Sequence, residues 1–283
     1  LKHCSNWCCS IFSNDISCIF ITLVQNKPVV FITGTSTGIG AGLVKAFADC
    51  GYRIACCARR EEVLTQTTKP LIEQGYEIKT YVVDVRKKKQ IHSAIEDCIS
   101  HFGQLDCVVA NAGISLPSHV ERYHSQIFDK TFNTNVLGVV NTFEKAIPYF
   151  IERKQGHLVS IGSLASFRGL PGAGAYCSSK AALATLTESL RIDLRKYNVD
   201  VTLVNPGFIK SPLTDQNNYN MPLIMPTAKG VKKIMKAILN RKKVYSFPWQ
   251  LSIPLKLSRL LPLWLYDAII SRVRNDKTIT ITD

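Results

Sequence analysis

Tyr176 and Lys180 are the pair of residues whose types and spacing point most directly to chemistry. Because they lie four positions apart on a predicted helix, both side chains project from the same face. A free tyrosine ionises at about pH 10. A neighbouring ammonium favours the anion and can lower that pKa by ~1 to 3. The pair could therefore give a proton to a substrate oxygen or take one from it.

Ser163 is a second candidate, because it lies thirteen positions before Tyr176 and directly behind an expected strand. A hydroxyl at the end of a strand can hold a substrate oxygen. A tyrosine and a lysine at helical spacing are, however, common on ordinary helix surfaces. The chemical interpretation therefore depends on the elements that would position these residues.

A glycine-rich turn spans residues 33–40, between an expected strand and an expected helix. Glycines let the backbone approach phosphates, and a helix N-terminus adds unpaired amides and the positive end of its dipole. Glycine also marks plain tight turns, so the turn alone leaves both interpretations open. The candidate cofactor contacts in it are Gly34, Ser36, Thr37, Gly38, Ile39 and Gly40.

The next expected strand ends in a sequence that bears on the choice of cofactor. An acidic residue at this place selects NAD, whereas an arginine accommodates the 2′-phosphate of NADP. Here Cys57 and Ala58 are followed by Arg59 and Arg60, with no carboxylate. Two guanidiniums would pair with a 2′-phosphate, which predicts NADP (NADPH). The alternative is that both arginines belong to a solvated helix start.

Short β-branched runs alternate with helix-like stretches from Val29 onward, a pattern typical of parallel strands joined by crossover helices. The sequence therefore predicts an α/β fold with a doubly wound parallel sheet in one domain, residues 27–247. Strands are expected at 29–33, 53–58, 77–84, 107–110, 157–161, 200–205 and 244–247. Helices are expected at 40–50, 88–100, 126–150 and 175–196.

The composition is that of a globular protein, with 46% apolar and 20% charged residues among 283. Ten cysteines show neither a disulfide framework nor the spacing of a zinc site. We therefore expect reduced thiols, no metal and a cytoplasmic location. Residues 1–26 contain a short apolar run but no small-residue cleavage site, and are expected to be a loose N-terminal extension.

The net charge of +14 favours an anionic partner. Much of this charge lies in residues 229–274, which contain eleven Lys or Arg and only Asp267 as an acid. The tail, residues 248–283, is expected to be helical with one apolar face and to be kinked or split at Pro262. It could attach peripherally to anionic lipid. Alternatively, it packs over a substrate pocket with its charges in water. Nucleic-acid binding lacks any recognition motif.

These elements together resemble the short-chain dehydrogenase/reductase family, in its members of about 250 residues. The resemblance covers about Val29 to Phe247 and implies a Rossmann fold. The motif residues stand in family order: the turn from Thr33 to Gly40, Asp84, Asn111–Ala112–Gly113, Asn135, Ser163, the Tyr176 and Lys180 pair, and Pro206–Gly207. Chance does not explain the match of so many motifs in the same order and at similar spacing.

The resemblance implies that Tyr176 protonates a substrate carbonyl while a nicotinamide delivers hydride to its carbon. Lys180 would lower the pKa of that tyrosine and bind the nicotinamide ribose. Ser163 would polarise the carbonyl, and Asn135 would hold a water that links Lys180 to solvent.

The same resemblance implies the remaining cofactor contacts. Asp84 and its neighbour Val85 would lie by the adenine, Asn111, Ala112 and Gly113 near a ribose, and Pro206, Gly207 and Ile209 beside the carboxamide. Ser211 stands where the family often has threonine, which preserves the hydroxyl.

The expected reaction is reduction of an apolar carbonyl, or oxidation of the corresponding secondary alcohol, with the loop 211–226 and the tail shaping the pocket. The tail lacks the glycine-rich ending of many oxoacyl-carrier-protein reductases of the family, which argues against that activity. A homodimer or homotetramer is expected from family habit. The alternative is a catalytically silent NADP-binding regulatory or scaffold protein, although all four catalytic residues are present.

Overall fold

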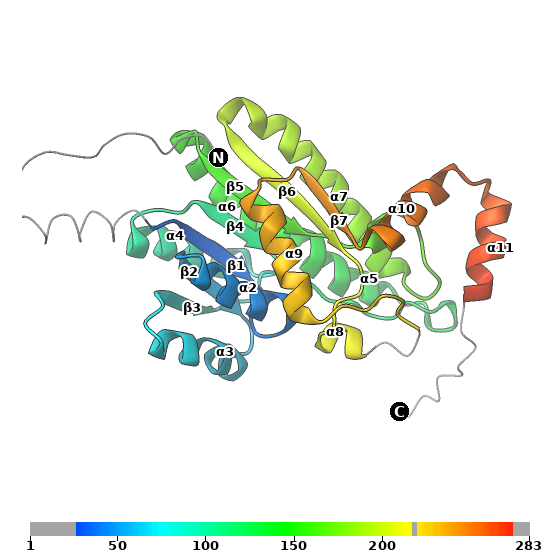
Figure 1. Ribbon diagram of the computed structural model, residues 1–283, viewed down its shortest axis with the longest axis horizontal. Coiled ribbons are helices and arrows are strands. Elements are labelled where there is room, and N and C mark those ends of the chain that lie inside the picture. The colour runs from blue at the N-terminus through cyan, green and yellow to red at the C-terminus, as the bar shows by residue number, and fades with distance from the viewer. Residues whose placement is uncertain (1–26, 217–219, 274–283) are drawn as a thin grey trace, which may run out of the picture.

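The computed structural model describes residues 27–216 and 220–273. Seven strands form one sheet in which every neighbouring pair is parallel, in the order β3-β2-β1-β4-β5-β6-β7 (Figure 1). The strands are β1 (Val29–Thr33), β2 (Arg53–Ala58), β3 (Ile78–Val82), β4 (Cys107–Ala110), β5 (Gly156–Ile161), β6 (Val199–Pro206) and β7 (Val244–Phe247). The predicted doubly wound α/β fold is confirmed.

Helices cover both faces of this sheet, so its central strands β1, β4 and β5 are buried along their whole length. The helices are α2 (Gly38–Asp49), α3 (Glu61–Glu73), α4 (Lys88–Phe102), α5 (Ser125–Phe132), α6 (Gly138–Arg153), α7 (Gly174–Asp193), α8 (Pro212–Asp215), α9 (Thr227–Leu239), α10 (Trp249–Leu257) and α11 (Leu263–Val273). Shorter turns are η1 (Val120–Arg122), η2 (Asn133–Leu137), η3 (Leu164–Ser166), η4 (Leu194–Tyr197) and η5 (Ser258–Leu260).

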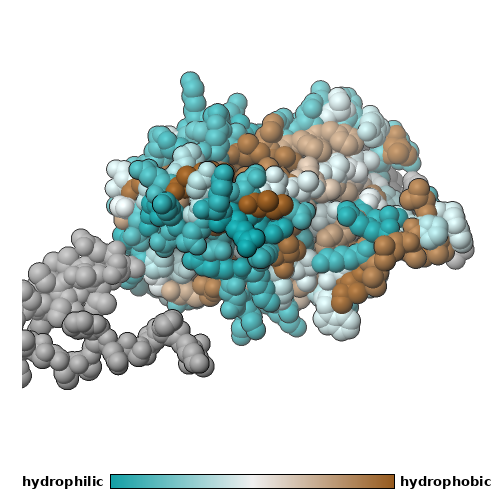
Figure 2. Space-filling view, turned by 90° about the horizontal axis from the view of Figure 1, so that it is seen from above, coloured by the Kyte–Doolittle hydropathy of each residue, from teal (hydrophilic) through white to brown (hydrophobic). Residues whose placement is uncertain are grey.

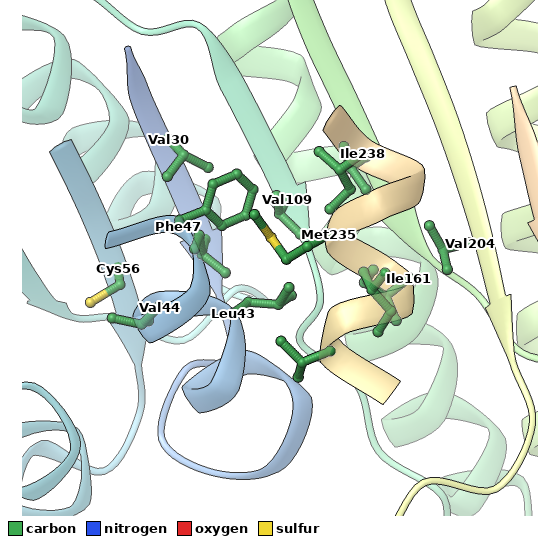
Figure 3. Packing of buried hydrophobic residues seen from close by; sticks show 14 of the residues in the cluster. Val30, Leu43, Val44, Phe47, Cys56, Val109, Ile161, Val204, Met235 and Ile238 are labelled. Atoms are coloured by element: carbon green, nitrogen blue, oxygen red, sulfur yellow. The ribbon is translucent and has the colours of Figure 1, made fainter. Parts of the chain in front are cut away.

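The alternation of side chains along β1 divides the core into two layers. Val30 and Ile32 face one layer with α2 and α9, whereas Val29 and Phe31 face the other with α4, α6 and α7. Figure 3 shows the first layer, in which Phe47 of α2 lies near side chains of α9. This packing fixes the N-terminus of α2, and the glycine-rich turn before it, over the end of β1.

The helix expected at 126–150 is interrupted by a single π-helical segment, η2, between α5 and α6. Such wide turns insert a residue into a helix and occur frequently at functional sites. Asn135 lies in this segment and is fully buried. Apolar periodicity does not report a one-residue insertion, so the sequence interpretation missed it.

The end of the chain follows the expected split at Pro262, because α10 and η5 end before this residue and α11 begins after it. The loop from Ser211 contains α8, which a reciprocal bond pair between Ser211 and Thr214 caps. Across residues 27–216 and 220–273, no helix is both long and apolar enough to cross a bilayer. The expected N-terminal extension and residues 274–283 lie outside the described residues.

The cysteines in the described ranges are free thiols. Burial raises the pKa of Cys56 and Cys98 to about 12, which keeps both thiols protonated and unreactive at neutral pH. No group of three or more potential metal ligands occurs within the same ranges.

Candidate active site

The sequence-predicted residues converge on the carboxyl ends of the parallel strands. The turn after β1, the segment after β4, Ser163 after β5 and Gly207 after β6 all lie at this edge. The strand order reverses between β1 and β4, and in open α/β sheets a ligand binds in the crevice at such a switch point.

The glycine-rich turn has a backbone that side chains would not tolerate. Gly34 and Gly38 have φ of +71° and +58°, in the left-handed region that favours glycine. A Cβ added at Gly40 would lie 2.1 Å from the carbonyl oxygen of Gly34, and one at Gly34 would lie 2.7 Å from Cα of Ala112. The turn is therefore packed against the segment after β4, and this close packing requires glycine at positions 34 and 40.

The N-terminus of α2 is well suited to an anion. Its N-cap residue, Thr37, makes no side-chain cap hydrogen bond, and the first turn contains no acidic residue. Ile39, on the first turn, packs against the core and fixes the direction of the helix. A Cβ at Gly38 would lie 3.0 Å from Cβ of Ser211, so the loop after β6 approaches the turn from the other side.

The two arginines after β2 lie beside the same turn. Arg60 is the N-cap residue of α3, so the predicted helix start is present. Its guanidinium also donates to Oγ of Ser36 at 3.4 Å, while Arg59 is exposed. The helix-start interpretation and the anion-binding interpretation are therefore compatible in this structure.

Asp84 lies two residues beyond β3 and forms a close ion pair with Arg86, whose Nη2 is 2.5 Å from Oδ2. This hydrogen bonding lowers the pKa of the Asp84 carboxyl below its usual range. The next residue, Val85, is buried under the position of Gly138. A carboxylate is thus held in the ionised form just beyond the carboxyl end of β3.

Asn111 connects the segment after β4 to the turn after β1. Its Nδ2 donates to the carbonyl oxygens of Thr33 and Gly34, each at 3.0 Å. Oγ1 of Thr33 accepts from the backbone amides of Asn111 and Ala112 at 3.0 and 3.1 Å. Asn111, predicted to lie near a ribose, therefore holds these two segments together, and Thr33, which the sequence analysis named only as the start of the glycine-rich motif, supports it.

The side chain of Asn135 holds helix α7 and the segment after β4 together. Its Nδ2 donates to Oγ of Ser179 at 3.0 Å and to the carbonyl oxygen of Ile114 at 2.9 Å. Its Oδ1 accepts from the amide of Ile114 at 2.8 Å. Gly113 lies against this cluster, because a Cβ there would come within 3.3 Å of Oδ1 of Asn135 and 3.6 Å of Nζ of Lys180.

Lys180 is 5% exposed and lies on α7 beside Tyr176, with its Nζ 5.8 Å from the centroid of the tyrosine ring. Its Nζ donates to the carbonyl oxygen of Ile161, at the end of β5, at 2.8 Å. Burial lowers the pKa of this ammonium to about 8. The structure thus brings the predicted pair together and places the cation within the site.

Ser163 follows β5 and is the N-cap residue of η3, where its Oγ accepts from the amide of Ala165 at 3.1 Å. Its own amide donates to Oδ1 of Asn205 at 3.2 Å. Nδ2 of Asn205 is buried without a hydrogen-bond partner among the described residues. Asn205 directly precedes the predicted Pro206 and Gly207, and its position at a strand end was the signal that could have found it.

The segment after β6 completes the site. Pro206 is paired with Phe247, whose carbonyl oxygen accepts from the amide of Gly207 at 2.7 Å. Ile209 is buried against Gly230 at the start of α9. These contacts attach the predicted carboxamide-binding segment to β7 and α9.

This arrangement fits a dinucleotide. The turn offers close backbone approach and a helix N-terminus without a competing cap, Arg60 and Ser36 offer donors to a phosphate, and the ammonium of Lys180 lies at the opposite part of the crevice.

Comparisons with known proteins agree with this geometry. The family model described as short chain dehydrogenase matches residues 28–222. An uncharacterized oxidoreductase of Myxococcus xanthus (strain DK1622) is 40% identical over 243 residues, which cover 86% of this chain and 96% of the relative. The chain therefore belongs to the short-chain dehydrogenase/reductase family, as its motifs predicted, and is an oxidoreductase.

Solved structures show the same fold. ElxO with NADP bound aligns with a TM-score of 0.70 at 26% identity, over 78% of this chain and 96% of that chain. A short chain dehydrogenase/reductase from Burkholderia phymatum in complex with NAD aligns with a TM-score of 0.77 at 20% identity, over 87% of this chain and 96% of that chain. The fold is thus one that binds either dinucleotide.

Proposed function

We propose that this protein is an NADP-dependent oxidoreductase that interconverts an apolar carbonyl compound and its secondary alcohol. The observation that carries the proposal is the buried Lys180, whose Nζ lies 5.8 Å from the centroid of the Tyr176 ring. A buried ammonium next to a phenol favours the phenolate and makes the phenol a usable acid and base. This pair lies at the same sheet edge as the glycine-rich turn.

The cofactor would be held by residues along the crevice. The turn from Gly34 to Gly40 would take the pyrophosphate, and Asp84 would lie by the adenine. When bound, NADPH would supply a hydride to the substrate carbon. The proximity of Lys180 to Gly113 supports the proposal that this ammonium also binds the nicotinamide ribose.

Side chains of this protein would transfer the proton that the reaction needs. Tyr176 donates its phenolic proton to the carbonyl oxygen, and the charge of Lys180 stabilises the phenolate that remains. Ser163 hydrogen-bonds the same oxygen and orients the carbonyl. Asn135 would hold the water through which Lys180 exchanges protons with solvent. A correctly placed acid contributes about 100 to 10,000-fold to the rate.

The preference for NADP rests on Arg60 and Arg59. Arg60 reaches Ser36 at the phosphate-binding turn, and no carboxylate stands at the end of β2 where one would bind the ribose hydroxyl of NAD. The NADP bound to the similar ElxO supports this choice.

Exposed apolar side chains in the loop after β6 support an apolar substrate. Leu213, Leu223 and Ile224 are exposed in the loop that begins at Ser211, and Ser211 itself lies beside Gly38 of the glycine-rich turn. An apolar substrate would cover these side chains and remove them from water.

A panel of ketones and aldehydes of increasing chain length, followed by NADPH absorbance, tests the proposal. We expect consumption of NADPH that increases with the apolar length of the substrate, and much slower consumption of NADH. Ser163→Ala should slow turnover without weakening NADPH binding. If the protein binds NADPH tightly but consumes none of it with any carbonyl, a catalytically silent regulatory or scaffold protein becomes the better interpretation.

The proposal includes a homodimer through the helices around Asn135 and Tyr176. Leu137 in η2 and Ile192 in α7 are large apolar side chains that remain exposed on these helices in the single chain. Static light scattering should give at least twice the chain mass at micromolar concentration, and a lone subunit would refute this part.

A further inference from the structure

Helices α10 and α11, with η5 between them, form a C-terminal arm, residues 249–273, at one end of the molecule (Figure 1). Leu260 is 82% exposed and Trp264 is 72% exposed. The large apolar side chains exposed on the arm are Trp249, Ile253, Leu257, Leu260, Leu263, Trp264 and Ile269. Figure 2 shows apolar side chains gathered at this end. Soluble monomers rarely expose so many apolar side chains together, and such patches mark interaction sites.

The arm is fixed to the body by specific contacts, so its outward face is set by the fold. Oη of Tyr266 donates to the carbonyl oxygen of Gly169 at 2.7 Å, and the guanidinium of Arg168 lies 3.7 Å from the centroid of the same ring. Nε of Arg259 donates to the carbonyl oxygen of Phe167 at 2.8 Å. These anchors lie in the segment between Ser163 and Tyr176, so the arm stands next to the candidate active site.

The charge near the arm is strongly positive and largely unpaired. Residues 229–274 contain eleven Lys or Arg and one acid, Asp267. Of the nine basic residues from Lys229 to Arg259, Arg241 alone forms an ion pair with a carboxylate within the described ranges. On the arm itself, Lys256 is exposed. The arm thus presents apolar side chains together with an exposed cation, Lys256, and most of the cations that precede it in the chain, from Lys229 to Lys243, have no ion-pair partner among the described residues.

A second copy of this chain and a lipid bilayer are the two occupants that could cover the apolar side chains. Two identical arms in contact would bring their own cations together, which opposes association. An anionic bilayer accepts both features, because apolar side chains enter the boundary of the acyl chains while Lys and Arg meet lipid phosphates. Trp249 and Trp264 carry the amphipathic side chain that concentrates at membrane interfaces.

We propose that the C-terminal arm is a peripheral attachment surface for an anionic lipid bilayer. Trp249, Leu260, Leu263 and Trp264 enter the interface, and Lys256 contributes charge attraction. The segment between Ser163 and Tyr176 is thereby presented toward the membrane.

Sedimentation of the full chain with lipid vesicles tests the surface without cofactor or substrate, so its outcome is independent of the proposed oxidoreductase activity. We expect strong binding to phosphatidylcholine vesicles that contain roughly one third phosphatidylserine, and weaker binding to pure phosphatidylcholine or at high salt. The variant Leu260→Ser/Trp264→Ser should reduce the partition coefficient by at least about tenfold. The matched control Leu239→Ser, an exposed leucine on α9, should leave it unchanged.

Lys256→Glu provides a second variant that retains every apolar side chain, and it should weaken binding to anionic vesicles about fivefold or more. Thermal melts verify that each variant is folded. The proposal is overturned if the parent protein stays in the supernatant, or if folded arm variants sediment like the parent. It is also overturned if light scattering shows a dimer that the Leu260→Ser/Trp264→Ser variant dissociates, because the arm would then bind a second copy.

Discussion

The two ends of the parallel sheet both bury cationic side chains, but they hold them differently. At the amino ends of the strands, Arg53 is 9% exposed and donates to the carbonyl oxygens of Lys27 and Phe102. Arg153 is paired with Asp106 at 3.2 Å. The donors of these guanidiniums are thus occupied by the protein itself, and the groups stabilise the ends of the strands.

At the carboxyl ends, Lys180 has a different environment. Its one hydrogen-bond partner among the described residues is the carbonyl oxygen of Ile161, and its other neighbours are the ring of Tyr176 and the Cα position of Gly113. Arg53 donates three hydrogen bonds to carbonyl oxygens, whereas one carbonyl oxygen accepts from the buried ammonium of Lys180. Burial of a charge with few partners costs free energy, and ionisable groups perturbed by burial cluster at functional sites. The comparison shows that two buried cations can differ in how many partners they have, and the fewer partners of Lys180 support its proposed role in a reaction.

A hollow at the amino ends of the strands is lined by groups that already have structural partners. A hollow of about 370 Å³ opens at the amino ends, lined by residues that include Tyr52, His157 and Arg241. His157 is hydrogen-bonded to Thr202 and Arg241 is paired with Asp200, so these groups have structural partners.

Replacing Lys180 should give the largest effect. Lys180→Met removes the charge that stabilises the phenolate of Tyr176, so we expect kcat for carbonyl reduction to fall about 1,000-fold. Because methionine fills the buried space without a charge, thermal stability should stay equal or rise. Steady-state kinetics and a thermal melt measure both. If Lys180→Met keeps the parent rate, the cation at the carboxyl ends of the strands has a structural role like that of Arg53 at the amino ends.

A matched pair of glycines, one at each end of the sheet, sharpens the contrast. A Cβ at Gly40 meets the carbonyl oxygen of Gly34 at 2.1 Å, and one at Gly156 meets the ring of Phe150 at 2.2 Å. Gly40→Ala and Gly156→Ala should each lower the free energy of unfolding by about 3 kcal/mol. The folded fraction of Gly40→Ala should lose NADPH affinity, whereas that of Gly156→Ala should bind normally. Denaturant unfolding measures the two stabilities, and calorimetric titration of the folded variants measures their NADPH affinities. Equal affinities of the two variants would contradict the prediction.

The buried His157 predicts how the amino end responds to acid. Burial lowers the pKa of this imidazole to about 4, below its usual value of about 6.5. Between these values the unfolded chain binds a proton that the folded chain does not, so stability falls as the pH drops through this window, by roughly 3 kcal/mol in total. In urea unfolding, the free energy of unfolding should fall less between pH 7 and pH 4 for His157→Gln than for the parent protein. Parallel curves for both proteins would exclude this role.

Replacing Arg60 should give the smallest effect, and this effect should be confined to the affinity for the cofactor. Arg60→Ala removes a charged donor from the predicted 2′-phosphate site, so the Kd for NADPH should rise about tenfold while that for NADH is unchanged. Arg195→Ala, at an exposed arginine beyond α7, is the control. Fluorescence titration measures both constants. An equal change for the two cofactors would place the guanidinium away from the 2′-position.

Much of the fold could be predicted from the sequence. The strands β1, β2, β4 and β7 lie where they were predicted. In β1 and β4, burial on both faces leaves a nearly continuous apolar signal. The glycine-rich turn and the Tyr176 and Lys180 pair could also be found in the sequence, because each requires particular residue types at fixed positions. The expected strand at 77–84 is shorter, Ile78–Val82, because such signals do not mark strand ends.

Other features depend on contacts between distant segments and had no local signal. The π turn at Asn135 accompanies side-chain bonds to Ile114 and Ser179, twenty-one and forty-four residues away. Likewise, the apolar periodicity of the tail predicted a helical face but left open whether that face is exposed or packed over a pocket. That exposure follows from the anchoring of Tyr266 on Gly169, a pairing that no sequence pattern announced.

The central claim is that Tyr176 transfers the proton at the carboxyl end of the sheet, and Tyr176→Phe tests it most directly. The substitution removes one hydroxyl and keeps the ring beside Lys180. We predict that NADPH binds the variant as it binds the parent protein, while its rate of carbonyl reduction falls by at least about 1,000-fold in single-turnover measurements. A variant that reduces the same carbonyl at the parent rate would contradict the account.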